Sequence, residues 1–361
     1  KEEINFEDLM PGMPCLIHGT RHNCEYAPPK DAIPPIYEPK FVKTNQVDYI
    51  DDEGLVASVT IDKETRAYPI SFLDYHEIVN DVIGDTHFAV SYCPLCASSL
   101  VFNRQITKNK PPTKFGVSGF LYQSDLLMFD HETESLWSQI EGESVYGEKM
   151  GRELELIPFQ LMKWKDWKKV YPESKVLSLD TGYARDYLHF PYGEYNVMDK
   201  VFFPVKRKDE NNRLHPKTMV YGIEANGHAK VYPEDYILDQ KIINDTVGKT
   251  PIVIITDEAN GVLAFEADIS DEKLIFERTE TGLLDKSSRS KWDFTGKSTS
   301  GKFKGKKLKI RPDLLRMFYF AWVAFNPKVE VEIYQNIHEK TTWKERLFKR
   351  FKKKEDDSKE K

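Results

Sequence analysis

Apolar and polar residues alternate in short runs along much of the chain, as in β-strands that bury one face. Residues 56–61 and 88–92 are runs of this kind, and glycine, Asn-Asp and Thr-Gly turn signals separate such runs. Two stretches, 72–81 and 161–172, have the pattern of short helices, and a proline ends the second. The pattern therefore predicts a mainly β protein, of the β-rich α+β kind, with a few short helices.

The chain also contains an internal repeat. Residues 66–92 match residues 230–256, and tryptophan-containing segments farther along match in the same order. This self-similarity predicts two similar lobes that arose by internal duplication. We expect five regions: an N-terminal extension packed on the first lobe (1–54), the first lobe (55–178), a linker (179–218), a second, degenerate lobe (219–333) and a basic tail (334–361).

Comparing the two copies separates residues that serve the fold from candidates for function. Several aromatic and glycine positions recur in both copies, which favours a structural role. They are Tyr68 and Tyr232, Trp137 and Trp292, Trp167 and Trp322, and Gly151 and Gly305. The Asn-Asp pairs at 80–81 and 244–245 also recur, and we interpret them as turn residues. In contrast, His76, Cys93 and Cys96 occur in the first copy alone.

The first copy is also longer between two aligned positions. The segment from Phe115 to Asp130 has six residues more than the segment from Phe276 to Asp285. Its additional length carries four polar side chains: Ser118, Tyr122, Ser124 and Asp125. Because the thiols, the imidazole and these polar groups gather in one copy, we expect the functional site in the first lobe.

Composition and charge exclude some classes of function. The chain is 40% hydrophobic, enough for a sizeable core, and no apolar run approaches the roughly 20 residues that span a bilayer. The net charge is −6, but residues 340–361 carry +5 and the remainder −11, so we expect no nucleic-acid partner. Trp343, Leu347 and Phe351 recur every four residues in the tail. Residues 343–354 form either a basic amphipathic helix on an anionic membrane surface or a solvated tail.

Cys93 and Cys96 lie in a Cys-Pro-Leu-Cys segment between two strand-like runs. A turn of this form points backbone N–H groups at thiolate sulfurs. With His76 before them, the count of ligands reaches three, the number in a catalytic zinc site with one open position. Two thiolates and an imidazole also suit copper(I). The neighbouring polar shell would be Tyr122, Ser124, Asp125 and Gln139.

Other interpretations of Cys93 and Cys96 stay open. Thiol–disulfide exchange needs a thiolate of low pKa at the start of a helix, whereas the residues after the motif have a strand pattern. A buried thiol pair beside a core histidine would be purely structural, in a cell-surface binding or assembly module. No phosphate loop or dinucleotide fingerprint occurs, so we expect no nucleotide cofactor.

The other two cysteines, Cys15 and Cys24, flank His18 and His22. These four side chains could ligate zinc, but so short a cluster would strain tetrahedral geometry. We therefore expect a Cys15–Cys24 disulfide, which is common outside the cytoplasm.

The linker contains a segment, residues 180–195, that is dense in tyrosine and aspartate and includes Arg185. Such residues can line a polar groove that binds a saccharide or another protein. The alternative is a loop packed across the two lobes with its hydroxyl groups satisfied.

Four long motifs occur in order: YPISFLDYHEIVND, SYCPLCASSLVF, FGVSGFLYQSDLLMFDHETESLWSQ and DTGYARDY. Together they resemble the bacterial and archaeal domain-of-unknown-function family 3179, over roughly Pro28 to Val331. The members are mostly exported or membrane-tethered, so the resemblance implies an extracytoplasmic protein, which a start at Lys1 instead of Met fits. The family implies no established reaction.

The resemblance also places the candidate residues. His76, Cys93 and Cys96 fall on positions within the family motifs. The chain departs from the family at Ala97, where a glycine commonly follows the second cysteine, and in its N-terminal cysteines and basic tail. The hypothesis is thus an exported protein with one copper or zinc ion, or a redox site, at His76, Cys93 and Cys96.

Overall fold

The structure is a computed structural model that describes residues 9–11, 29–205, 213–326 and 331–333. Cys15 and Cys24 lie outside these residues, and their disulfide stays a prediction. The same holds for the membrane contact predicted for residues 343–354.

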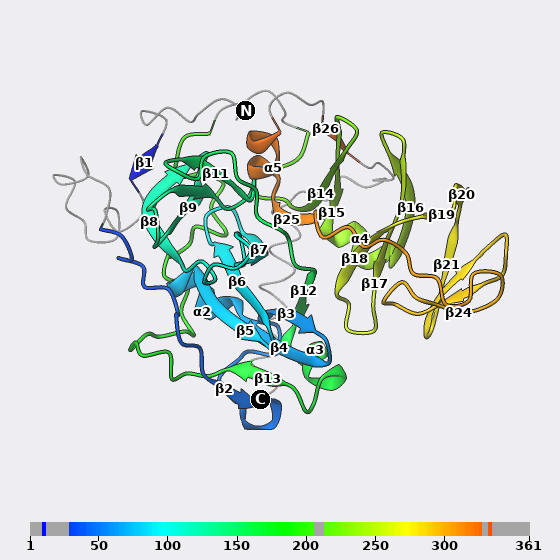
Figure 1. The fold of residues 1–361 in the computed structure, drawn as a ribbon, viewed down its shortest axis with the longest axis horizontal. Helices are drawn as coiled ribbons and strands as arrows, with labels where there is room; N and C mark the ends of the chain where they lie inside the picture. The colour runs from blue at the N-terminus through cyan, green and yellow to red at the C-terminus, as the bar shows by residue number, and fades with distance from the viewer. Residues whose placement is uncertain (1–8, 12–28, 206–212, 327–330, 334–361) are drawn as a thin grey trace.

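The described residues form many short strands in small, mostly antiparallel sheets, with four α-helices of seven residues each. The mainly β prediction is confirmed (Figure 1). Alternate side chains of a strand point to opposite faces, and the strands that contain residues 56–61 and 88–92 bury consecutive residues, 56–59 and 88–93, so both faces of these strands are covered instead of one.

The first lobe consists of three sheets and two helices. One sheet has the order β12 (Phe159–Lys163), β3 (Leu55–Ile61), β4 (Glu64–Pro69), β13 (Lys175–Leu177) and β2 (Phe41–Lys43). The second has the order β5 (Ile78–Ile83), β6 (Thr86–Cys93) and β7 (Ser98–Asn103). The third has the order β1 (Met10–Pro11), β8 (Phe115–Tyr122), β9 (Asp125–Asp130), β10 (Leu136–Ser138) and β11 (Glu143–Tyr146). The helices are α2 (Ile70–His76) and α3 (Trp164–Val170).

The second lobe has a corresponding set of elements. Its first sheet has the order β25 (Leu315–Phe318), β14 (Met219–Ala225), β15 (His228–Pro233) and β26 (Val331–Ile333). A second has the order β16 (Ile242–Val247), β17 (Thr250–Thr256) and β18 (Val262–Glu266), and a third β21 (Phe276–Thr279), β22 (Gly282–Asp285), β23 (Lys291–Trp292) and β24 (Ser298–Ser300). The remaining elements are the pair β19 (Asp268–Ile269) and β20 (Glu272–Lys273), and the helices α4 (Glu234–Gln240) and α5 (Tyr319–Phe325).

The two lobes share a strand order, including one parallel pair in each, β4 with β13 and β15 with β26. A common order agrees with the repeat in the sequence, while its origin by duplication and the region boundaries stay predictions. The N-terminal residues 29–54 contact the first lobe through β2, which pairs with β13, and through Ile36, which bridges to Val79.

The predicted helix at 72–81 is shorter than expected. It ends at His76, because Glu77 takes a positive φ of 57° and the chain then continues as β5. The helix predicted at 161–172 likewise covers only α3, since its first three residues belong to β12.

The interpretation of the Asn-Asp pairs as turn residues was wrong. Asn80 lies inside β5, where its amide donates to Phe115 O (2.9 Å) and accepts from Phe115 N–H (3.0 Å). Asn244 in β16 makes the same two bonds with Phe276, at 2.9 and 2.8 Å. Each asparagine therefore fastens one sheet of its lobe to the next.

One apolar core extends across both lobes. It contains Cys93, Phe102 and Trp137 from the first lobe and Met317 and Trp322 from the second, each buried. In Figure 1 the orange β25 of the second lobe lies beside β7, and α5 follows β25 along the chain. The end of the second lobe thus completes the core around the Cys-Pro-Leu-Cys segment.

Candidate metal site

The Cys-Pro-Leu-Cys segment forms the turn between β6, which ends at Cys93, and β7, which begins at Ser98. Ala97 closes this turn with a φ of 51°. The left-handed conformation costs a residue with a Cβ atom about 1–2 kcal/mol, whereas glycine adopts it freely. The tight turn therefore forms with alanine at a position whose conformation favours glycine, at some cost in local strain. We call residues 93–97 the metal loop.

A second tight turn joins β8 to β9, through Gln123 and Ser124. Both residues have positive φ, 52° and 70°, as a two-residue hairpin turn of type I′ requires. Asparagine and glycine are preferred at such positions, so neither residue is the expected choice. Strain of this kind is typical of functional sites. The turn places Asp125 at the first position of β9.

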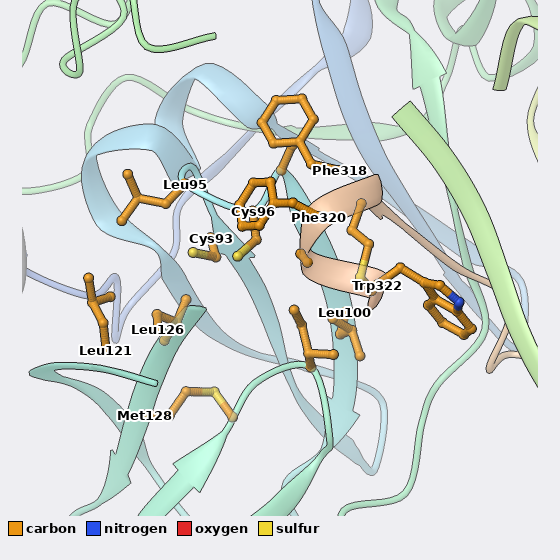
Figure 2. Packing of buried hydrophobic residues seen from close by; sticks show 14 of the residues in the cluster. Cys93, Leu95, Cys96, Leu100, Leu121, Leu126, Met128, Phe318, Phe320 and Trp322 are labelled. Carbon is orange, nitrogen blue, oxygen red and sulfur yellow. The ribbon is translucent and has the colours of Figure 1, made fainter. Parts of the chain in front are cut away.

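The two turns bring three potential ligands together. The side-chain ligand atoms of Cys93, Cys96 and Asp125 all lie within 4.8 Å of one another. All three residues are buried, with exposed fractions of 1%, 0% and 1%. Figure 2 shows the side chains of Cys93 and Cys96 next to one another, with Leu126 and Met128 on one side and Phe318 and Phe320 of the second lobe on the other.

Hydrogen bonds orient the Asp125 carboxylate. Its Oδ2 accepts the Ile140 N–H at 3.1 Å, and its Oδ1 lies 3.3 Å from the hydroxyl of Ser98. The Ser98 hydroxyl also donates to Gln139 Oε1 at 2.9 Å, and Gln139 Nε2 donates to Ser91 Oγ at 3.1 Å. A buried polar network thus fixes the carboxylate beside the thiols.

Ser124 also belongs to the site. Its backbone carbonyl accepts the Cys93 thiol, with an S···O distance of 3.9 Å. The Ser124 hydroxyl oxygen is buried and has no hydrogen-bond partner among the described residues. A buried polar atom without a partner is costly, so a missing group beside it, such as an ion or a water molecule, has a physical reason to be there.

Tyr122, in contrast, is not placed with the thiols. Its ring packs edge-on against Phe325 of α5, with the ring centroids 5.9 Å apart. Of the predicted polar shell, the structure therefore brings Ser124, Asp125 and Gln139 to the site, and Asp125 is close enough to be a ligand itself.

Burial determines the charge of the site. Burial raises the pKa of the Cys93 thiol, and it raises the pKa of Cys96 well above its usual value. Burial also raises the pKa of Asp125 to about 7. Because a low-dielectric interior disfavours each anion, a cation among the three groups would reverse these shifts and stabilise the deprotonated forms.

His76 does not join the two sulfurs, and the predicted ligand set of His76, Cys93 and Cys96 is not assembled in the structure. Its Nδ1 lies 2.6 Å from Pro34 O and its Nε2 lies 2.6 Å from the Tyr187 hydroxyl. A carbonyl only accepts, so Nδ1 carries the proton and Nε2 accepts the Tyr187 O–H. A metal at His76 would have to displace one of these bonds.

Two buried acids near the site were missed in the sequence. Glu77 follows α2, and burial raises its pKa to about 8, while the Tyr192 hydroxyl donates to its Oε1 at 3.2 Å. The Oδ1 of Asp74, one turn earlier, is buried without a partner among the described residues. Asp74 lies on α2 and Glu77 is the residue directly after it, and the packing of α2 against β6 explains why both lie near the site.

The comparisons with known proteins give a family and no activity. The family described as "Protein of unknown function (DUF3179)" matches residues 30–329. The chain belongs to this family. No curated protein and no solved structure matches the chain significantly. Among the described residues of this DUF3179 member, no helix is long and apolar enough to cross a membrane.

Proposed function

We propose that the protein binds one zinc ion through Cys93, Cys96 and Asp125. The observation that carries this proposal is the convergence of three ligand atoms within 4.8 Å. Two sulfurs on a tetrahedral zinc ion lie about 3.8 Å apart, given zinc–sulfur distances of about 2.3 Å. The side chains therefore need only small shifts to close around an ion.

The donor set favours zinc over copper(I). Zinc accepts thiolate and carboxylate together, whereas copper(I) prefers soft sulfur donors, and the imidazole expected from His76 is engaged elsewhere. The fourth position would belong to a water molecule or to the Ser124 hydroxyl, which is buried and unpartnered among the described residues. A bound water molecule could form a hydrogen bond with the Ser124 hydroxyl, and direct ligation would bind that hydroxyl to the ion, so the buried oxygen would gain a partner in both cases.

Burial makes thiol–disulfide exchange the weaker proposal. Exchange requires an accessible thiolate of low pKa. Here Cys93 and Cys96 are 1% and 0% exposed, and burial raises the pKa of both. These properties suit thiols that are deprotonated by a bound cation.

Titration of reduced, metal-free protein with Co²⁺ tests the zinc proposal, because thiolate ligation gives charge-transfer absorption that zinc then abolishes. We expect one equivalent of Co²⁺ to bind and Cys93→Ser to lose the absorption. His76→Gln, which copies Gln240 of the second lobe, should retain it. If His76→Gln abolishes the absorption and Asp125→Asn does not, the proposed ligand set is wrong.

Export and a protein partner at residues 180–195 are further proposals. Within this segment Tyr183 and Leu188 are 42% and 76% exposed, whereas Tyr187, Tyr192 and Tyr195 are buried. Part of the segment thus packs across the lobes and part faces outward. Cell fractionation tests export. Chemical cross-linking tests the partner: we expect Leu188→Ser to lose the cross-linked partner and the control variant Leu179→Ser, at another exposed leucine, to retain it.

A further inference from the structure

Two backbone carbonyl groups of the metal loop accept hydrogen bonds from parts of the chain outside the first lobe. Leu95 O accepts the Tyr195 hydroxyl of the linker at 2.9 Å. Cys96 O accepts the backbone N–H of Phe318 in β25 at 2.8 Å. The carbonyl groups of Leu95 and Cys96 therefore face the linker and the second lobe, respectively.

The position of Tyr195 is fixed by burial and by contacts with Lys217. It is fully buried, and the Lys217 ammonium donates to Tyr195 O and lies 3.4 Å from the centre of the Tyr195 ring. Lys217 is only 3% exposed. A buried amine with a carbonyl and an aromatic face as its partners fixes the backbone and the ring of Tyr195 together.

The same part of the linker is tied to β25 and α5. The N–H of Tyr319 donates to Thr218 O at 2.9 Å, and the N–H of Phe320 donates to Pro216 O at 2.8 Å. Tyr195, Lys217 and the junction of β25 with α5 thus form one connected unit over the metal loop, which we call the clamp. Figure 2 shows Phe318 and Phe320 of this unit next to Cys96.

We propose that Tyr195 and Phe318 are positioning residues for the metal loop, and that the clamp holds Cys93 and Cys96 in the ligating arrangement. This inference rests on the proposed zinc site. The strained φ of Ala97 means that the loop gains little from its own local conformation, so bonds from outside must offset the cost. Zinc affinity and docking of the clamp are then coupled, and each strengthens the other.

A matched pair of tyrosine variants tests the clamp. Tyr195→Phe removes the bond to Leu95 O, and Tyr49→Phe removes an equivalent tyrosine bond, also 2.9 Å, to Leu177 O in the first lobe. In metal-free protein we expect Tyr195→Phe to speed alkylation of the buried thiols about three- to tenfold. The same variant should raise the Co²⁺ dissociation constant by a similar factor, with one ion still bound. Tyr49→Phe should change neither quantity.

A second variant keeps the test decisive if Tyr195→Phe does not fold. Lys217→Met retains an apolar stem over the Tyr195 ring but removes the donor to Tyr195 O, and it should shift both quantities in the same direction. Equal alkylation rates and equal Co²⁺ affinities in wild type, Tyr195→Phe and Lys217→Met overturn the clamp while the zinc site stands. Absence of Co²⁺ binding in wild type overturns the zinc site, and alkylation of the metal-free variants then reports on the loop alone.

Discussion

In the first lobe Cys93 begins the turn between β6 and β7, and in the second lobe Asp257 begins the turn between β17 and β18. Asp257 Oδ1 accepts the N–H groups of Ala259 and Gly261 at 2.9 and 2.8 Å, and its Oδ2 accepts Gln160 Nε2 at 2.7 Å. The carboxylate thus completes its own turn. At the same place in the first lobe stands a thiol, and a second thiol and a carboxyl group converge on it.

The hairpin that follows this turn in the chain also differs between the lobes, and it is longer in the first lobe. In the first lobe β8 and β9 have eight and six residues, whereas β21 and β22 have four each. The longer hairpin reaches the metal loop with Asp125 at its tip. One scaffold therefore carries, in the second lobe, a turn whose carboxylate is satisfied by N–H donors, and, in the first lobe, a turn whose groups favour a cation.

The largest difference between the lobes should appear on removal of one aspartate from each. Asp125→Asn takes away a ligand, so we expect the zinc dissociation constant to rise by about 100-fold or more. Asp257→Asn lies in the other lobe and should leave it unchanged within about threefold. Competition with a chromophoric chelator measures both constants, and equal losses would show that the two carboxyl groups do not differ in role.

A smaller difference should appear in the pH dependence of stability. Glu77 has its pKa raised to about 8, so metal-free protein binds more protons when folded and loses stability as pH rises from about 4.5 to 8. Glu77→Gln should flatten this loss, which we expect to be on the order of 2 kcal/mol. Lys241 stands at the corresponding place after α4 and is exposed.

Lys241→Gln serves as the control for the Glu77 variant. It should leave the slope of the unfolding free energy against pH unchanged in urea titrations at pH 5 and pH 8. A wild-type stability that rises over this interval, or a slope that Glu77→Gln leaves as it is, would contradict the assignment.

The smallest effect should come from the left-handed residues of the two turns. Ala97→Gly relieves the strain at φ 51° and should stabilise the protein by about 0.5–1 kcal/mol. Asn260, at φ 58° in the second lobe, tolerates this conformation, so Asn260→Gly should change stability by only a few tenths of a kcal/mol. Thermal unfolding compares the two variants, and a larger gain at Asn260 would reverse the comparison.

Much of the fold and part of the site followed from sequence pattern. Short alternating runs predicted the strands, and the repeat indicated matching lobes, because period and self-similarity are properties of the chain itself. The comparison of the copies also pointed to Cys93, Cys96 and the longer hairpin. Asp125 was expected only as a neighbour, since pattern does not show that a type I′ turn brings it within ligand distance.

Where the structure differs from the sequence-based predictions of the site, the cause is a contact between residues that are far apart in the sequence. The residue type of His76 predicts a metal ligand, but its two ring nitrogens are hydrogen-bonded to Pro34, 42 positions before it, and to Tyr187, 111 positions after it. Likewise the bonds from Tyr195 and Phe318 to the metal loop join distant segments. Such contacts depend on how the linker and the lobes pack, which local pattern does not encode.

The most direct test of the zinc site is elemental analysis of native protein purified without chelator or metal-affinity resin, alongside Asp125→Asn and His76→Gln. About one zinc per chain in wild type and in His76→Gln, and none in Asp125→Asn, is the predicted result. Stoichiometric metal in Asp125→Asn, or its loss in His76→Gln alone, would contradict a site built from Cys93, Cys96 and Asp125.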